Sequence, residues 1–98
     1  MLNIVRSMHQ FLGGLQKIER EIIERTRAAG IYLRPQNLQW QRGQGLMPPP
    51  AAIAVQIRVQ GKTANTTFSR DQVENSWERV ARPDVCARVQ EIIERLTS

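Results

Sequence analysis

The sequence predicts one small α+β domain, with helices packed on one face of a small antiparallel sheet. Residues 3–29 repeat apolar side chains at helical spacing, residues 53–68 alternate apolar with polar side chains, and residues 70–96 return to helical spacing. A chain of 98 residues supports one hydrophobic core and leaves no room for a second. We therefore expect a single domain over residues 1–98.

Residues 3–29 are predicted to form one long helix, because apolar side chains recur at alternating steps of four and three residues. The stripe consists of Ile4, Met8, Phe11, Leu15, Ile18, Ile22 and Ala29. Asn3 can cap the start of the helix, and Gly30 can adopt the left-handed conformation that ends it. Gly13 and Gly14 interrupt the pattern at a cost of about 1 kcal/mol each. Either the helix kinks at this pair or a neighbouring backbone approaches it closely.

Residues 31–50 are predicted to be an irregular, basic segment in which residues 38–42 could form a short strand. Regular structure is interrupted here by Pro35, Gly43, Gly45 and the triple proline 48–50. The triple proline is expected to adopt an extended polyproline II conformation. A connection of this length is unusual in a compact domain and is often functional or mobile.

Residues 53–68 are predicted to form a β-hairpin, because apolar and polar side chains alternate with the period of a half-buried strand. A two-residue turn at Gly61-Lys62 fits the sequence and would place Val59 opposite Ala64 and Val55 opposite Phe68. The outward face would then carry hydrogen-bonding side chains and a single charge. Its members are Gln56, Arg58, Gln60, Thr63, Asn65 and Thr67.

Two helices are predicted over residues 70–80 and 84–96. Ser69 and Gln72 have the spacing of a capping box, which favours a helix start at that point. Pro83 suits the first turn of the second helix. The inward-facing residues would be Val73, Trp77 and Val80 in the first helix and Val85, Val89, Ile92 and Leu96 in the second.

The chain contains one cysteine, Cys86, and one histidine, His9. An internal disulfide and the usual cysteine and histidine zinc sites are therefore excluded, and we expect neither metal nor cofactor. The two residues fall in separate predicted helices, so a paired thiol and base is not indicated. We expect Cys86 to be a small buried side chain and His9 to be structural.

Other catalytic patterns are also missing, including the glycine-rich phosphate loops and the nucleophile elbow. The carboxylates instead stand four residues before arginines, in the order that stabilises exposed helix faces. The pairs are Glu21 with Arg25, Glu78 with Arg82 and Glu91 with Arg95. We therefore expect no catalytic residue and no enzymatic activity.

The longest apolar runs are far shorter than the roughly 20 residues needed to cross a bilayer, so no membrane segment is expected. The first residues lack a basic lead followed by an apolar stretch and a cleavage site. A cytoplasmic location is expected.

Positive charge is concentrated in the middle of the chain, within a net charge of +5. No acidic residue occurs between Glu24 and Asp71. An anionic partner, either nucleic acid or an acidic protein, is therefore expected to contact the central segment and the hairpin. The candidate contacts are Arg34, Arg42, Arg58 and Lys62, with Trp40 and Tyr32 as surfaces for base stacking.

A different hypothesis follows from the length of the first helix, which would span about 40 Å at 1.5 Å per residue. A compact domain of this size has a diameter of roughly 32 Å, so one helix end would overhang. A homodimer would cover the exposed apolar stripe, formed by Ile4, Met8, Phe11 and Leu15. Self-association through this helix, as a small interaction protein, is the first functional hypothesis, and nucleic-acid binding is the alternative. The sequence does not identify the partner.

Overall fold

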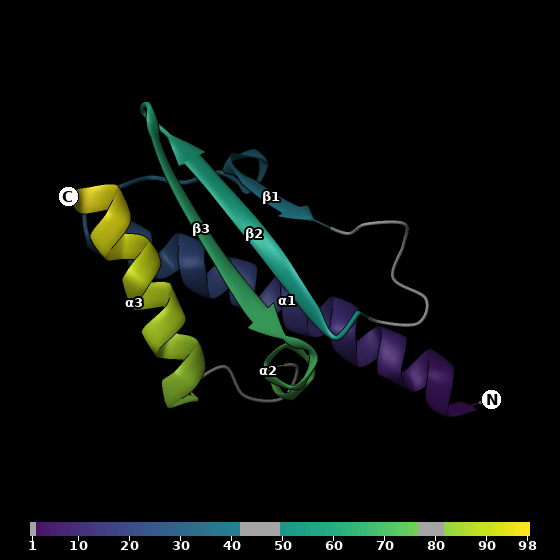
Figure 1. The fold of residues 1–98 in the computed structure, drawn as a ribbon. Coiled ribbons are helices and arrows are strands. Elements are labelled where there is room, and N and C mark those ends of the chain that lie inside the picture. The colour runs from purple at the N-terminus through teal and green to yellow at the C-terminus, as the bar shows by residue number, and fades with distance from the viewer. Residues whose placement is uncertain (1, 42–49, 77–81) are drawn as a thin grey trace.

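The computed structural model describes residues 2–41, 50–76 and 82–98, with side chains from His9 onward. Figure 1 shows the order of the elements, which confirms the predicted α+β class. They are the helix α1 (Leu2–Ala28), the 3-10 turn η1 (Pro35–Asn37), the strands β1 (Leu38–Gln41), β2 (Ala52–Val59) and β3 (Lys62–Ser69), and the helices α2 (Arg70–Asn75) and α3 (Pro83–Thr97). No helix among these residues is long and apolar enough to span a membrane.

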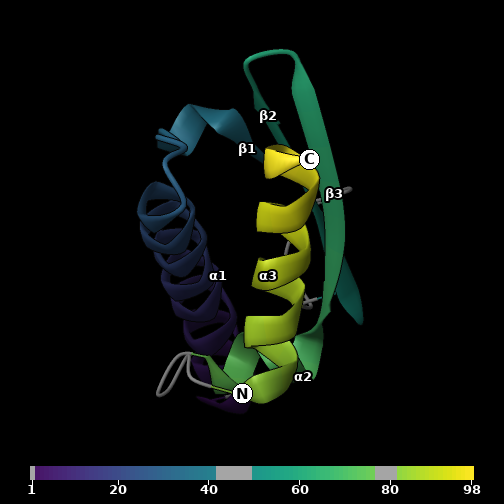
Figure 2. The same cartoon turned by 90° about the vertical axis from the view of Figure 1, so that its left-hand side faces the viewer.

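The three strands form an antiparallel sheet in the order β1-β2-β3. Both α1 and α3 lie on the same side of this sheet, as Figure 2 shows, and no helix among the described residues lies on the other side. The short strand expected within residues 38–42 is β1, and its Leu38 pairs with Ile57 of β2. The sheet therefore has one inner face, packed on helices, and one open face.

The hairpin turn lies at Gln60-Gly61, one residue before the predicted position. Both turn residues have positive φ, 52° and 77°, as a type I′ turn requires. Val59 consequently pairs with Lys62, and Val55 pairs with Thr66 instead of Phe68. The predicted register was wrong by two residues. Because side chains alternate with period two, a shift of two leaves the strand residues on their predicted faces, but Gln60, predicted for the outward face, lies in the turn.

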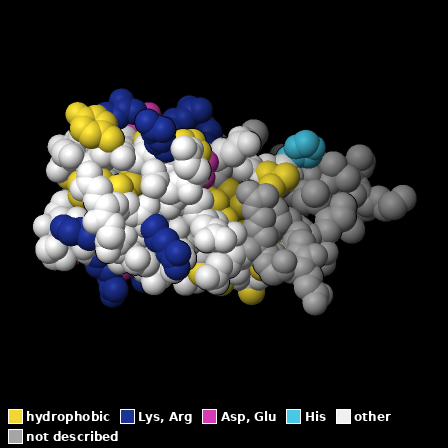
Figure 3. All heavy atoms as spheres, turned by 90° about the horizontal axis from the view of Figure 1, so that it is seen from above, with side chains coloured by type: hydrophobic (Ala, Val, Ile, Leu, Met, Phe, Trp, Pro, Cys, Tyr) yellow, Lys and Arg dark blue, Asp and Glu magenta, His cyan; other side chains and the backbone are white. Residues whose placement is uncertain are grey.

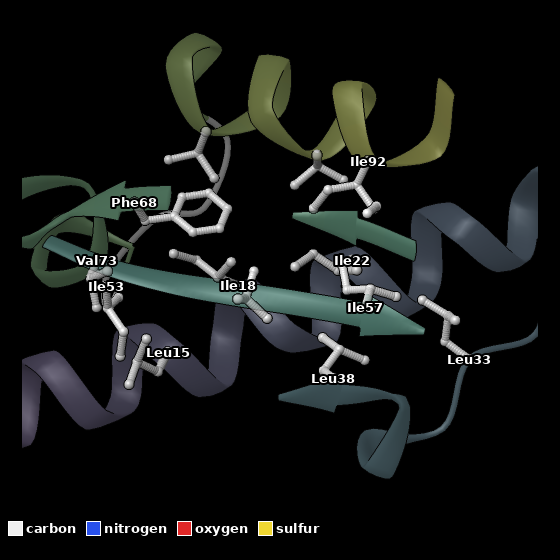
Figure 4. Packing of buried hydrophobic residues seen from close by; sticks show 14 of the residues in the cluster. Leu15, Ile18, Ile22, Leu33, Leu38, Ile53, Ile57, Phe68, Val73 and Ile92 are labelled. Atoms are coloured by element: carbon white, nitrogen blue, oxygen red, sulfur yellow. The ribbon is translucent and has the colours of Figure 1, made fainter. Parts of the chain in front are cut away.

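The core lies between the inner face of the sheet and the two long helices. Figure 4 shows Ile18 and Ile22 of α1 and Ile92 of α3 beside the strands that carry Ile57 and Phe68, and all five side chains are buried. On the sheet, Ile53, Val55 and Ala64 complete this inner layer. Burial of each large apolar side chain contributes about 1.5–3 kcal/mol, which makes this layer the main source of stability.

α1 runs continuously through Gly13 and Gly14, and its first turns extend beyond the sheet (Figure 1). A Cβ atom on Gly14 would lie 1.8 Å from the carbonyl oxygen of Val73 in α2. The second glycine therefore permits close approach of the α2 backbone, one of the two predicted alternatives. At the far end Gly30 has φ of 90°, and the N–H of Ile31 donates to the carbonyl of Thr26. This is the expected left-handed helix end.

The capping box at the start of α2 is formed as predicted. Ser69 Oγ accepts from the Gln72 N–H at 3.1 Å, and Gln72 Oε1 accepts from the Ser69 N–H at 2.9 Å. α2 ends at Asn75, earlier than the predicted residue 80. At this end of the helix the Ser76 hydroxyl donates to the Gln72 carbonyl. Trp77 and Val80 lie outside the described residues. α3 begins with Pro83 in its first turn, as expected.

Candidate functional site

The open face of the sheet is polar. It consists of Gln39, Gln41, Ala54, Gln56, Arg58, Thr63, Asn65 and Thr67, which alternate with the buried residues of the inner face. Gln39, Gln56 and Asn65 are direct partners across the three strands and form one row of amides, called here the amide row. None of the three strands contains an acidic residue. The open face can therefore offer hydrogen bonds without repelling an anion.

A hollow of about 390 Å³ lies at the tip of the hairpin, beside the end of η1. We call it the hairpin hollow, and its lining residues are Asn37, Arg58, Val59, Gln60, Gly61, Lys62 and Thr63. Asn37 connects two distant parts of the chain here. Its Oδ1 accepts from the Arg34 N–H, and its Nδ2 donates to the Arg58 carbonyl, both at 2.8 Å. Asn37 thereby links the backbones of two predicted anion contacts, Arg34 and Arg58.

Lys62, the third predicted anion contact that the structure describes, has a structural partner. Its Nζ donates to the carbonyls of Leu96 and Ser98, each at 3.1 Å. A cation at a helix C-terminus is stabilised by the helix dipole, so Lys62 fastens the end of α3 to the hairpin. Its charge is partly offset there, which leaves Arg58 as the main cationic group that lines the hairpin hollow. Arg42, also predicted as an anion contact, lies outside the described residues.

Arg34 and Arg58 are both exposed. The ion pairs within residues 9–41, 50–76 and 82–98 are formed instead by Arg25, Arg82 and Arg88. Figure 3 views the molecule from above in the orientation of Figure 1, and on this side lysine and arginine side chains stand out while acidic ones scarcely show. Exposed positive charge therefore outweighs exposed negative charge on this side of the molecule.

Trp40 does not belong to the open face. Its ring is half-buried on the inner side of β1, with its centroid 6.1 Å from that of Phe68. The indole N–H donates to Glu19 Oε1 of α1 at 3.3 Å. These contacts make Trp40 a link between β1 and α1, which argues against its predicted use in base stacking. Tyr32, after the end of α1, is 74% exposed.

Residues predicted for self-association divide into two groups. Phe11 is 0% exposed and Leu15 is 4% exposed, and both belong to the core of their own chain. Neither side chain is available at the surface for a second copy, which corrects the expectation that they form an exposed stripe. The side chains of Ile4 and Met8 lie outside the described residues.

A second hollow, of about 410 Å³, lies along α1 beside Pro35. Its charged lining mixes acids with bases: Glu19, Arg20, Glu24 and Arg27. A hollow lined by charges of both signs suits a polyanion less well than the hairpin hollow does.

Cys86 was expected to be buried, but it is half-buried. Its Sγ lies 3.4 Å from Nη2 of Arg25, whose Nε donates to Glu21. The hydrogen bond to Glu21 is the main cause of the raised pKa of Arg25. His9 is exposed on α1. Among the described side chains, no three of histidine, cysteine, aspartate and glutamate gather as a metal site.

One of the three predicted glutamate–arginine pairs is formed, between Glu21 and Arg25. Glu91 instead lies 3.6 Å from Arg88. Arg82 pairs with Asp71 at 3.2 Å and Asp84 at 3.0 Å, and Glu78 is outside the described residues. All the observed pairs are partly exposed, as solvated helix faces are expected to be.

The sequence did not single out Asn37 or Gln39. The hydrogen bond from Asn37 to β2 spans 21 residues, and no local pattern indicates it. Gln39 joins the amide row only through the pairing of β1 with β2.

A search with the sequence and the structure finds no matching protein family, no similar curated protein and no similar solved structure.

Proposed function

We propose that this protein binds nucleic acid through its open face, with Arg34 and Arg58 beside the hairpin hollow contacting phosphates. The observation that carries the proposal is a polar sheet face without acidic residues, together with two exposed arginines. The side chain of Asn37 hydrogen-bonds the backbone groups of both arginines. Arginine contacts to phosphates supply affinity for any sequence. Amide and hydroxyl side chains are the groups that hydrogen-bond base edges.

The distribution of acidic residues gives the proposed complex a direction. Glu19 and Glu24 lie on α1, and Glu91 and Glu94 lie on α3, in each case interspersed with basic residues, so phosphates at the helix side would meet charges of both signs. The open face and the hairpin hollow present positive charge without acidic neighbours on the strands. An approaching polyanion would therefore be oriented toward the sheet.

The proposal predicts a change in the salt dependence of binding when Arg34→Gln and Arg58→Gln are combined. Each lost phosphate contact should reduce the slope of log K against log salt concentration by about 0.9 for a duplex. The control is Arg95→Gln, which removes one positive charge, half the change of the double variant, from an exposed position on α3. Fluorescence anisotropy of a labelled duplex over a series of salt concentrations measures all three proteins.

We expect the double variant to bind more weakly with a shallower slope, and the Arg95 variant to resemble the wild type. Equal slopes for the double variant and the wild type would place the phosphate contacts elsewhere. A wild-type protein that binds no nucleic acid at low salt would refute the proposal.

Self-association through the first turns of α1 is a second candidate. The specific observation in its favour is that α1 continues through the glycine pair and extends beyond the sheet (Figure 1). A helix that extends beyond its own sheet is suited to pairing with a second copy. Since Phe11 and Leu15 are used in the core, such a contact would depend on the residues before them.

A further inference from the structure

We infer that the nucleic acid is double-stranded DNA, read in its major groove by the amide row. This inference rests on the proposed function and adds to it the form of the nucleic acid and the groove that the protein contacts. It follows from the width of the sheet, the side on which its aromatic rings lie, and the chemistry of the residues in the row.

The width of the sheet matches the major groove. Neighbouring strands lie about 4.8 Å apart, so the axes of β1 and β3 are about 10 Å apart. The major groove of B-form DNA is about 12 Å wide, whereas the minor groove is about 6 Å wide. Two neighbouring strands fit within the major groove, which admits a two-stranded ribbon, and no pair of strands fits within the minor groove. The major groove of an RNA duplex is too narrow for side chains to read.

The aromatic side chains of the sheet are on the wrong side for a single strand. Proteins that hold single strands stack bases on aromatic rings. Trp40 and Phe68 both belong to the inner face, where they pack against each other. The described open face carries amides, hydroxyls, one alanine and one arginine. Tyr32 is exposed but lies outside the sheet, so stacked bases would find one ring at most among the described residues.

The amide row has the chemistry of base-edge recognition. Gln39, Gln56 and Asn65 each carry a donor and an acceptor, as required for bidentate contact with adenine in the major groove. Because these residues are direct cross-strand partners, their side chains leave the sheet at the same level. Arg58 lies two residues nearer the hairpin tip than Gln56, on the same face and opposite Thr63. Phosphate contacts would therefore flank the base contacts on the hairpin side.

Four probes of one mixed sequence test this inference with the full chain. They are a DNA duplex of roughly two helical turns, about 20 base pairs, the corresponding RNA duplex, the single DNA strand, and a DNA duplex whose cytosines carry glucosylated 5-hydroxymethyl groups. The glucose fills the major groove while leaving the phosphates and the minor groove intact. We expect plain duplex DNA to bind best and the glucosylated duplex to bind about tenfold more weakly or worse, a loss within the range of base-edge contacts.

Equal binding of the plain and glucosylated duplexes, or tighter binding of RNA or of the single strand, would overturn the inference and leave the proposed function standing. Failure to bind all four probes would refute both. Gln56→Ala supplies the residue-level test, with Gln90→Ala on the exposed side of α3 as its control. We expect the Gln56 variant to lose affinity for a duplex selected from a random library by about fivefold or more, with an unchanged salt slope. An unchanged affinity would contradict the role of the amide row.

Discussion

Gly14 marks a close contact between α1 and the backbone of α2. A Cβ atom there would lie 1.8 Å from the carbonyl oxygen and 2.7 Å from the carbonyl carbon of Val73. Backbone atoms cannot move aside as the end of a flexible side chain can. The helix therefore includes a residue of low helix propensity because α2 packs directly on its backbone.

Gly14→Ala sets two opposite effects against each other. Alanine favours the helix by about 1 kcal/mol over glycine, but the added methyl group must displace α2, and overpacking of this kind costs about 1–3 kcal/mol. At 1.8 Å we expect the overlap to dominate, so that the free energy of unfolding falls. Urea denaturation measures it, with the exposed Gln16→Ala in the same helix as a control that stays within about 0.5 kcal/mol of wild type. A more stable Gly14 variant would contradict the close approach.

At the scale of the elements, the start of α3 is fastened to α2 by a small charged network. Asp84 accepts from Gln72 Nε2 at 3.2 Å, from the Val85 N–H at 2.9 Å and from Arg82 at 3.0 Å. The hydrogen bond from Gln72 is the main cause that lowers the pKa of Asp84. Asp71 in turn raises the pKa of Arg82 through its hydrogen bond. Both shifts favour the charged forms in the folded state.

A lowered folded-state pKa gives the contribution of Asp84 a definite pH dependence. The ionised carboxylate stabilises the fold above its ordinary pKa of 3.8, and this stabilisation is lost as the pH falls through the lower folded-state value. We expect the difference in unfolding free energy between wild type and Asp84→Asn to be constant near neutral pH and to shrink below 3.8. Chemical denaturation at a series of pH values measures this difference.

Glu94→Gln is the control for this prediction, since Glu94 is exposed on the same helix and outside the network. Its effect on stability should change less over the same acidic range. If the Asp84 variant differs from wild type by the same amount at all pH values, the hydrogen-bonded network does not favour the ionised carboxylate.

At the scale of the whole molecule, the sequence was most informative where a local pattern determines the structure. Ser69 and Gln72 cap α2 as their spacing predicted, and the alternation in residues 53–68 assigned each strand side chain to its correct face. The hairpin register depended on the backbone angles of Gln60, which adopts the positive φ more usual for glycine or asparagine. The pattern alone could not reveal that choice.

Contacts between distant segments were beyond prediction for a different reason. Asn37 joins Arg34 to Arg58, and Trp40 turns inward toward Glu19 of α1. Neither arrangement follows from residues close in sequence. The basic residues of the candidate site were therefore identified by composition, while their grouping around the hairpin hollow required the fold.

The length of α1 was predicted correctly, but its consequence for the apolar stripe was only partly anticipated. The molecule measures 45 × 27 × 18 Å, and its radius of gyration is 13.4 Å. The helix extends past the sheet (Figure 1), yet Phe11 and Leu15 are already beneath other parts of the chain. Among the described side chains of the stripe, Phe11 and Leu15 serve the core, so a second copy could use only the turns before them.

Phe11→Glu separates these two roles. Removing a buried phenylalanine costs about 3–5 kcal/mol, and a carboxylate without a partner in the core adds several more. A domain of this size has about 5–15 kcal/mol of stability in total, so we expect the variant to lose its cooperative thermal transition by circular dichroism at every protein concentration. His9→Glu, at an exposed position two residues earlier, should remain folded.

Ile4→Glu with Met8→Glu should also remain folded and, if the chain self-associates, should reduce the mass measured by light scattering from twice 11.2 kDa to 11.2 kDa. A folded Phe11 variant of 11.2 kDa beside a wild type of twice that mass would show instead that Phe11 lies in an interface between copies.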